Sequence, residues 1–189
     1  MNRELKWVIL IAAAVVAAFI GMALSQYVMA NASSGGSLIF TLAMLGIVGG
    51  ILYWLLSGNK KVVMADAGAT TAALAMRPSE GKAAIYIYRK GFVGMLQGFN
   101  FAIEGVASGQ AKGNQFLHAE VAPGSYRITA KAKGNGGETE VSVAAGEVAV
   151  LRVELEPGLV TGKIVFDRVA NPAMAKADLA SIKMVSWDG

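Results

Sequence analysis

Two apolar stretches without a single charged residue constrain this chain more than any other feature of its sequence. The first covers Trp7–Ala30 and the second covers Leu38–Ser57, which gives runs of 24 and 20 residues. A helix rises about 1.5 Å per residue, so each run is long enough to cross a hydrocarbon core of about 30 Å. The join at 31–37 is small and polar, as a tight loop requires. Residues 1–61 therefore predict a two-helix transmembrane hairpin, with helices at about 7–30 and 38–57.

The positions of lysine and arginine predict how such a hairpin is oriented. Arg3 and Lys6 precede the first run, Lys60 and Lys61 follow the second, and the loop between the runs has neither residue type. The positive-inside rule then places both termini in the cytoplasm. We expect a multi-pass protein of the bacterial inner (plasma) membrane, with the lipid bilayer as its first partner. A cleaved signal peptide is the alternative for the first run, but that run exceeds the usual 7–15-residue apolar region.

Small residues recur at four-residue spacing in both apolar runs and predict close helix packing. One stripe contains Ala13, Ala17 and Gly21, and a second contains Gly46 and Gly50. Small side chains let helix backbones approach each other closely. The simplest interpretation is that the two helices pack on each other, and the alternative is packing against other subunits. Neither run contains an ionisable residue, which disfavours a pump or a transporter.

The remainder of the chain changes from long apolar runs to an alternating pattern. Residues 62–82 predict a juxtamembrane linker, with Asp66 able to cap a short helix over about 67–76. From Ala83 onward, apolar residues alternate with polar ones in about seven short runs that turn signals such as Pro123-Gly124 separate. This pattern predicts an antiparallel β-sandwich over residues 83–170. Asn171-Pro172 then predicts a short helix to about Ile182, followed by an apolar tail, within residues 171–189.

Two motifs in this half of the chain carry a family resemblance. The first is Ile85-Tyr86-Ile87-Tyr88-Arg89, and the second is Val121-Ala122-Pro123-Gly124-Ser125-Tyr126. Over roughly residues 80–168 the chain resembles the uncharacterised bacterial DUF2846 domain, and more loosely the carboxypeptidase-regulatory-like and PEGA-type sandwiches. The resemblance implies a β-sandwich with a binding or structural role, and it transfers no catalytic residue. The expected fold is thus a membrane protein with a transmembrane hairpin, an all-β antiparallel sandwich and a short C-terminal helix.

Composition excludes several classes of chemistry. Cysteine is absent, so thiolate nucleophiles, thiolate metal sites and disulfides are excluded. Residues 83–189 carry eleven Lys and Arg against ten Asp and Glu, a net charge of +1, whereas nucleic-acid binders present a basic face. The single histidine, His118, shares a strand face with Phe116 and Glu120, which is too few ligands for zinc. We therefore expect no catalytic residue, no metal, no cofactor and no nucleic-acid partner.

One glycine-rich but apolar segment at 91–98 is the candidate interaction site. Its apolar members, with the two cations before it, are Arg89, Lys90, Phe92, Val93, Met95 and Leu96. The segment matches no phosphate-binding motif, and it forms either a plug at one end of the sandwich or a contact patch. The leading hypothesis is a non-enzymatic accessory or scaffolding subunit of a bacterial membrane protein assembly, with membrane protein partners or a homo-oligomer. The alternative is a membrane-anchored domain that binds or senses a lipid or a small ligand at this segment.

Overall fold

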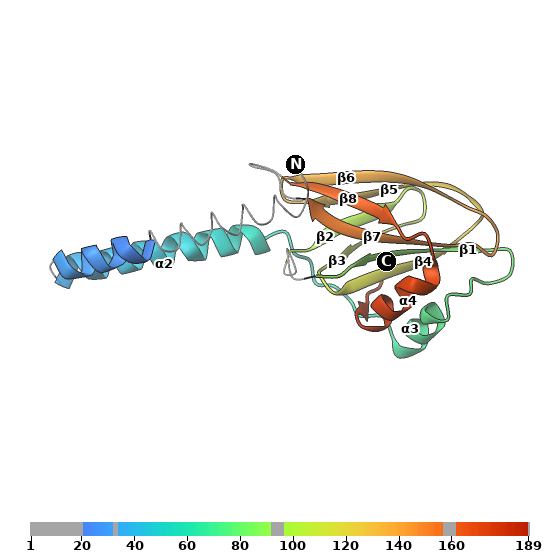
Figure 1. The fold of residues 1–189 in the computed structure, drawn as a ribbon, viewed down its shortest axis with the longest axis horizontal. Helices are drawn as coiled ribbons and strands as arrows, with labels where there is room; N and C mark the ends of the chain where they lie inside the picture. Colours follow the sequence, from blue (N-terminus) through green and yellow to red (C-terminus); the bar gives the residue numbers. More distant parts are fainter. Residues whose placement is uncertain (1–20, 32–33, 92–96, 157–161, 189) are drawn as a thin grey trace. The chain divides into compact units, whose positions relative to one another are not determined.

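The computed structural model describes residues 21–31, 34–91, 97–156 and 162–188. The chain divides into two compact units, Met1–Ser57 and Gly58–Gly189. The first unit is helical where it is described, at residues 21–31 and in α2 (Ser34–Leu56). The second unit contains all of the strands and two short helices (Figure 1).

The helical unit corrects the prediction of a transmembrane hairpin. Within the described residues, no helix combines the length and the apolar character needed to cross a membrane. The predicted hairpin, and the inner-membrane location inferred from it, are therefore wrong by this finding. Two of the residues predicted for helix packing, Ala13 and Ala17, lie outside the described residues.

The second unit consists of two packed β-sheets. The five-stranded sheet has the order β8-β7-β1-β4-β9, and the four-stranded sheet has the order β3-β2-β5-β6. The strands are β1 (Ala83–Arg89), β2 (Phe99–Ile103), β3 (Ala107–Ala111), β4 (Gln115–Val121), β5 (Gly124–Ala132), β6 (Asn135–Val143), β7 (Val148–Glu156), β8 (Lys163–Arg168) and β9 (Lys183–Met184). The β-sandwich expected from the alternating sequence is thus present, with β3 and β9 as strands that the sequence did not indicate.

The five-stranded sheet is mixed, whereas the sequence predicted an antiparallel one. β1 pairs antiparallel with β4 but parallel with β7, and β4 pairs parallel with β9. The physical reason is burial on both faces, which is typical of strands in parallel pairs. All seven residues of β1 are buried. Its isoleucines face the other sheet, and its tyrosines Tyr86 and Tyr88 face the opposite way.

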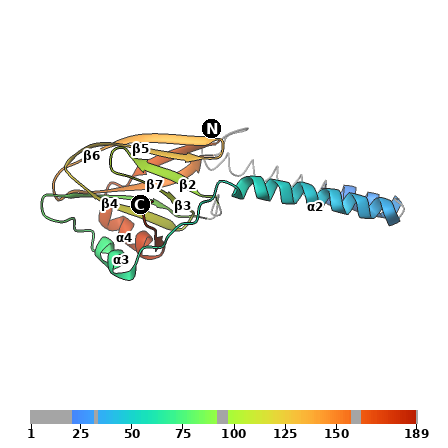
Figure 2. The same ribbon diagram turned by 180° about the vertical axis from the view of Figure 1, so that it is seen from behind.

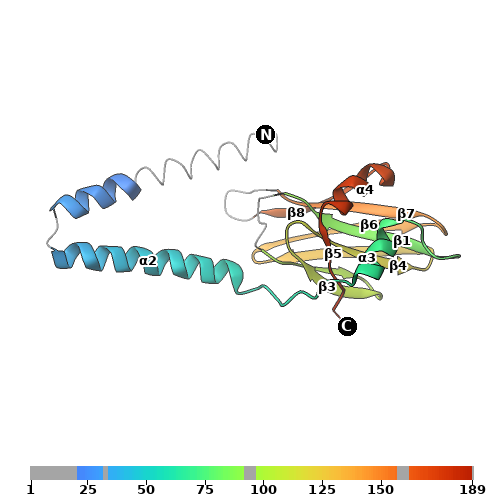
Figure 3. The ribbon, with the colours of Figure 1, turned by 90° about the horizontal axis from the view of Figure 1, so that it is seen from below.

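Two short helices cover the outer face of the five-stranded sheet. α3 (Ala67–Leu74) begins at Asp66, whose Oδ1 accepts a hydrogen bond from the backbone N–H of Ala69 at 2.8 Å. α4 (Pro172–Ala180) begins at Asn171, whose Oδ1 accepts from Ala173 at 3.0 Å. Both predicted caps are therefore confirmed. Figures 2 and 3 show that the two helices lie on the same side of the sandwich.

Glycine allows the edges of the two sheets to meet at β6 and β8. A Cβ atom on Gly137 would collide with the backbone carbonyl of Ile164, so the two strands approach more closely than any side chain would allow. Beside this contact, Asn135 Oδ1 accepts a hydrogen bond from the backbone N–H of Gly162 at 2.6 Å. The preceding hairpin turn contains Gly134, whose φ of +69° is readily adopted only by glycine. The sandwich is therefore closed along this side.

Candidate functional site

The interior between the sheets is filled by its own side chains. Nineteen buried residues from both sheets form one core, with Phe99, Phe101, Leu117, Ile128 and Leu151 among the largest. Burying such side chains removes apolar surface from water at about 25 cal/mol per Å². The described interior is therefore filled by packed apolar side chains. This packing does not support a ligand held between the sheets.

A second cluster lies between the five-stranded sheet and the covering helices. Its buried members from the strands are Ala84, Tyr86, Tyr88, Phe116 and Val150, and those from the helices are Ala73, Ala175 and Leu179. Tyr86 donates its hydroxyl hydrogen to the carbonyl of Ala73 at 2.6 Å, which ties β1 to α3. Burial, with the nearby charge of Glu120, raises the pKa of Tyr86 to about 12. The hydroxyl of Tyr86 therefore stays protonated at neutral pH and serves as a hydrogen-bond donor to α3.

His118 belongs to the same face and packs against Tyr86. Its ring lies 4.7 Å from the ring of Tyr86, and burial lowers its pKa although Glu120 acts in the opposite direction. Glu120 accepts hydrogen bonds from the hydroxyl and the backbone N–H of Ser79, at 2.8 and 3.1 Å. These bonds, led by the one from the hydroxyl, lower the pKa of Glu120. Among the described residues, no group of three or more metal-ligating side chains is present.

The two predicted interaction cations have different positions. Arg89 is 4% exposed, its guanidinium carbon lies 3.5 Å from the centre of the Phe99 ring, and Nη1 donates to the carbonyl of Gln97 at 2.8 Å. Burial lowers the pKa of Arg89 to about 10. Lys90 is exposed and bonds Asp178 of α4 at 2.7 Å, and Tyr88 donates to the same carboxylate at 3.3 Å. Arg89 therefore holds the base of the 91–98 segment, while Lys90 secures α4.

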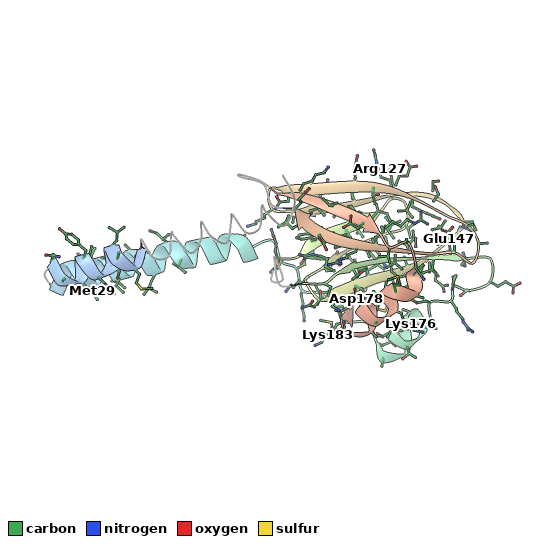
Figure 4. The ribbon with its side chains drawn as sticks, viewed as in Figure 1. Met29, Arg127, Glu147, Lys176, Asp178 and Lys183 are labelled. Atoms are coloured by element: carbon green, nitrogen blue, oxygen red, sulfur yellow. The ribbon has the colours of Figure 1, made fainter. Side chains whose placement is uncertain are left out.

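The remaining residues of the predicted interaction segment, Phe92, Val93, Met95 and Leu96, lie outside the described residues. Among the described polar residues that Figure 4 labels, Lys176 and Asp178 belong to α4 and Lys183 begins β9. Arg127 lies far from them, on the outer face of the four-stranded sheet, with Glu138 at 3.7 Å. Such exposed pairs contribute little stability and specify no ligand.

The glycines predicted for helix packing are open in the structure. Among the described residues, nothing outside their own helix lies within 4 Å of a Cβ atom added to Gly21, Gly46 or Gly50. Exposed apolar side chains surround these positions, including Leu38, Ile39, Leu42, Leu45, Ile47 and Val48. Residues 7–20 of the first run lie outside the described residues, so packing of the two helices on each other stays a prediction.

The structure also shows how the C-terminal end of the chain is attached on the side of the sandwich opposite β6 and β8. The tail segment, defined here as Lys183–Asp188, crosses from one sheet to the other. Val185 donates to the carbonyl of Phe116 in β4 at 2.9 Å, and Asp188 donates to the carbonyl of Ser108 in β3 at 2.8 Å. The indole Nε1 of Trp187 donates to the carbonyl of His118 at 2.7 Å. The only sequence signal for this arrangement is that the tail is apolar.

An entry segment, defined here as Gly58–Ala65, lies beside the tail segment. Ser186 donates to the carbonyl of Val63 at 2.9 Å, and Ala65 donates to the carbonyl of Met184 at 3.1 Å. The buried Gln110 of β3 fastens the start of the segment: its Oε1 accepts from Lys60 at 2.7 Å and its Nε2 donates to Gly58 at 3.1 Å. Part of the predicted linker is therefore attached to the sandwich.

Comparison with known proteins is consistent with the resemblance expected from the sequence. Residues 79–168 match a family model described as protein of unknown function, DUF2846, and this confirms the resemblance for that region. The matched region begins after α3 and ends with β8, so it covers the two sheets without the tail segment. No curated protein matches the chain.

Proposed function

We propose that this chain, which carries a DUF2846 domain over residues 79–168, is a non-enzymatic subunit of a multi-chain protein assembly. Its helical unit packs against the helices of other copies of the chain. The β-sandwich provides a rigid docking body of nearly neutral charge. The proposal rests on one observation above all, the exposure of apolar side chains around α2.

Exposed apolar residues occupy every side of α2. Leu38, Ile39 and Leu45 are 62%, 70% and 63% exposed, and Ile47 on another side is 56% exposed. Successive residues of a helix are about 100° apart, so these positions do not form a single stripe. A helix that is apolar all round is normally buried in its functional state. Contact with other helices would remove this surface from water at about 25 cal/mol per Å².

The open glycines support close contact between helices. Gly46 and Gly50 lie one turn apart on α2, and no described residue outside the helix lies within 4 Å of the space that a side chain would occupy. Small residues at this spacing let two helix backbones approach each other. A second copy of the chain presents the same small positions and the same exposed apolar side chains, which makes it the natural partner for this surface.

Ligand sensing is the second hypothesis from the sequence. It would need an apolar pocket near the 91–98 segment. The packed core and the buried Arg89 favour a docking body over a ligand-binding one.

Sedimentation of the full chain in a mild detergent tests the proposal. We expect a discrete oligomer for the natural chain, and mass spectrometry identifies any other chain that is present. The double variant Gly46→Leu, Gly50→Leu should shift the distribution toward the monomer, because leucine prevents close approach. Val48→Leu, on the opposite side of α2, is the matched control and should leave the oligomer intact. A natural chain that sediments only as a monomer, with no other protein, contradicts the proposal.

A further inference from the structure

The charges of the sandwich are unevenly distributed, although they nearly cancel in sum. Residues 83–189 contain seven lysines, and six of them lie at strand ends or in the turns beside them. Lys90 follows β1, Lys112 follows β3, and Lys163 and Lys183 begin β8 and β9. The other two flank Ala132, the last residue of β5. We call these six residues the basic end: Lys90, Lys112, Lys131, Lys133, Lys163 and Lys183.

Strand pairing places all six lysines at the same end of the sandwich. In the five-stranded sheet Arg89, the last residue of β1, pairs with Gln115 of β4, which pairs with Lys183 of β9. β7 runs parallel to β1 and antiparallel to β8, so β8 begins at this end too. In the four-stranded sheet the start of β2 lies beside the ends of β3 and β5. The two sheets share this end, because the guanidinium of Arg89 lies over the ring of Phe99 at the start of β2.

Few acidic residues balance the basic end. Asp178 pairs with Lys90 at 2.7 Å, and Glu156 is the register partner of Lys163. Six lysines against these two acids leave a surplus of four positive charges. The turn after β2, at the opposite end of the sandwich, carries the acidic residue Glu104 instead. The near-neutral total charge therefore conceals one strongly positive end.

The lysines spread across the whole width of this end. Lys163 and Lys183 belong to the two edge strands of the five-stranded sheet, four strand spacings or about 19 Å apart. Lys131 and Lys133 belong to the other sheet, at a distance of about 10 Å between sheets. Lysine presents a point charge on a flexible stem, whereas arginine binds phosphate in a fixed bidentate geometry. The basic end thus fits a broad array of negative charges better than one small ligand.

Two observations favour a lipid surface over a nucleic acid as that array. No aromatic side chain is exposed among the described residues of the sandwich, so bases have no ring to stack on. The chain also enters the sandwich at this end. Gly58, two residues after α2 ends at Leu56, lies beside Lys133, whose Cε would be 3.5 Å from an added Cβ. An apolar helix followed directly by clustered lysines combines the two forces that attract proteins to anionic lipid.

We propose that the basic end binds a surface of anionic phospholipid headgroups. The lysines contact the headgroups from the aqueous side, so the contact needs no element that crosses a membrane. Anionic lipid attracts each lysine near its surface, and salt screens this attraction. The inference goes beyond the helical association proposed above and does not depend on it, because all six lysines lie in the second unit.

Phospholipid binding to the full chain in neutral detergent micelles tests the inference. Phosphatidylglycerol, which is anionic, and phosphatidylcholine, which has no net charge, are titrated into separate samples. Native mass spectrometry counts the lipids that each chain retains. We expect tighter binding of phosphatidylglycerol at about 0.05 M salt, and loss of most of this preference at about 0.5 M salt.

A matched pair of triple variants locates the contact. The basic-end variant removes three exposed charges from this end: Lys131→Gln, Lys163→Gln and Lys183→Gln. The control variant removes three exposed charges from other places: Lys82→Gln, Arg127→Gln and Lys176→Gln. The two variants have the same net charge, and circular dichroism checks that both fold. The basic-end variant should weaken phosphatidylglycerol binding about tenfold or more, and the control variant less than about twofold.

The results separate this inference from the proposed function. Equal weakening by the two triple variants, or equal binding of the two lipids by the natural chain, overturns the inference. A DNA duplex that binds more tightly than phosphatidylglycerol, and is lost in the basic-end variant, also overturns it, since the partner is then a nucleic acid. An oligomer in sedimentation without a preference for phosphatidylglycerol leaves helical association standing and rejects the lipid contact. A preference that persists in the Gly46→Leu, Gly50→Leu background supports the lipid contact even where helical association fails.

Discussion

The indole nitrogen of Trp187 donates a hydrogen bond to the backbone carbonyl of His118, with 2.7 Å between the two atoms. This bond joins residues 69 positions apart and fixes the tail segment on the strand that carries the only histidine. His118 itself directs its ring toward Tyr86, on the helix-covered face of the sheet. The backbone of His118 thus contacts the tail segment, and its side chain contacts the cluster beneath the two helices.

Replacement of Trp187 by phenylalanine tests how strongly this bond holds the tail segment. Phenylalanine keeps most of the ring contact with Gly109 but cannot donate a hydrogen bond. We expect Trp187→Phe to lower the free energy of unfolding by about 1 kcal/mol, the usual contribution of one hydrogen bond. Urea denaturation followed by circular dichroism measures this value. Ser186→Ala is the control and should change stability by less, because the hydrogen bond of Ser186 to Val63 comes from its backbone.

Replacement of Gly137 by alanine tests the close approach of β6 and β8. A methyl group at this position collides with the carbonyl of Ile164, which belongs to the backbone and cannot rotate away. We expect Gly137→Ala to destabilise the domain by about 1–3 kcal/mol, as overpacking does. Gly136→Ala is the matched control one residue earlier, because its Cβ would lie 3.9 Å from its nearest neighbour. Equal stability of the two variants in thermal denaturation would contradict the closed edge.

Much of the sandwich could be predicted from local sequence, because its strands alternate and its helices have recognisable caps. Asp66 and Asn171 both accept the bonds that their positions predict. The parallel pairing of β1 with β7 could not be predicted, since pairing partners depend on contacts between residues far apart in the chain. Residues 91–98 were predicted as an interaction segment from composition, but the buried state of Arg89 depends on stacking against Phe99.

The apolar runs show the limit of a pattern based on length. Their lack of charge predicted a membrane hairpin, yet no helix among the described residues meets the requirement for crossing a membrane. The attachment of the tail segment was missed for a different reason. A two-residue strand and two single bridges have too few residues to produce a period, so only the apolar character of Met184 and Val185 remained visible.

The raised pKa of Tyr86 predicts how stability changes at alkaline pH. Its pKa is about 12 in the folded chain and 10.0 in the unfolded reference, so the folded state binds the proton more tightly. Stability is therefore fully present below pH 10 and decreases as the pH rises through the folded pKa near 12. Denaturation midpoints between pH 9 and 12 should fall less steeply for Tyr86→Phe than for the natural chain. Tyr88, whose pKa is also raised, should account for part of the slope that remains.

At neutral pH the same variant should lose about 1 kcal/mol, because the carbonyl of Ala73 loses its donor. The natural chain and Tyr86→Phe should therefore approach each other in stability as the pH rises. Parallel curves across the whole range would show that Tyr86 ionises as easily in the folded chain as in the unfolded one.

Gln110 provides the last test, because one buried amide holds the entry segment to the four-stranded sheet. Its Oε1 accepts from Lys60, and its Nε2 donates to Gly58 and, at 3.0 Å, to Asn100 in β2. Gln110→Leu has a similar size but removes both functions, and it leaves Lys60, Gly58 and Asn100 without their bonds to the amide. We expect a loss of about 2–3 kcal/mol, since three hydrogen bonds of about 1 kcal/mol each are removed.

Gln110→Glu distinguishes the two functions of the amide. It retains an acceptor for the N–H of Lys60 but loses the donors to Gly58 and Asn100. If the entry segment is held mainly through Lys60, hydrogen exchange should show continued protection of that amide in Gln110→Glu and rapid exchange in Gln110→Leu. Rapid exchange at Lys60 in the natural chain would contradict the bond. Protection of Gly98, whose N–H bonds Asn59 Oδ1 at 2.7 Å, reports whether the loosening extends along the entry segment.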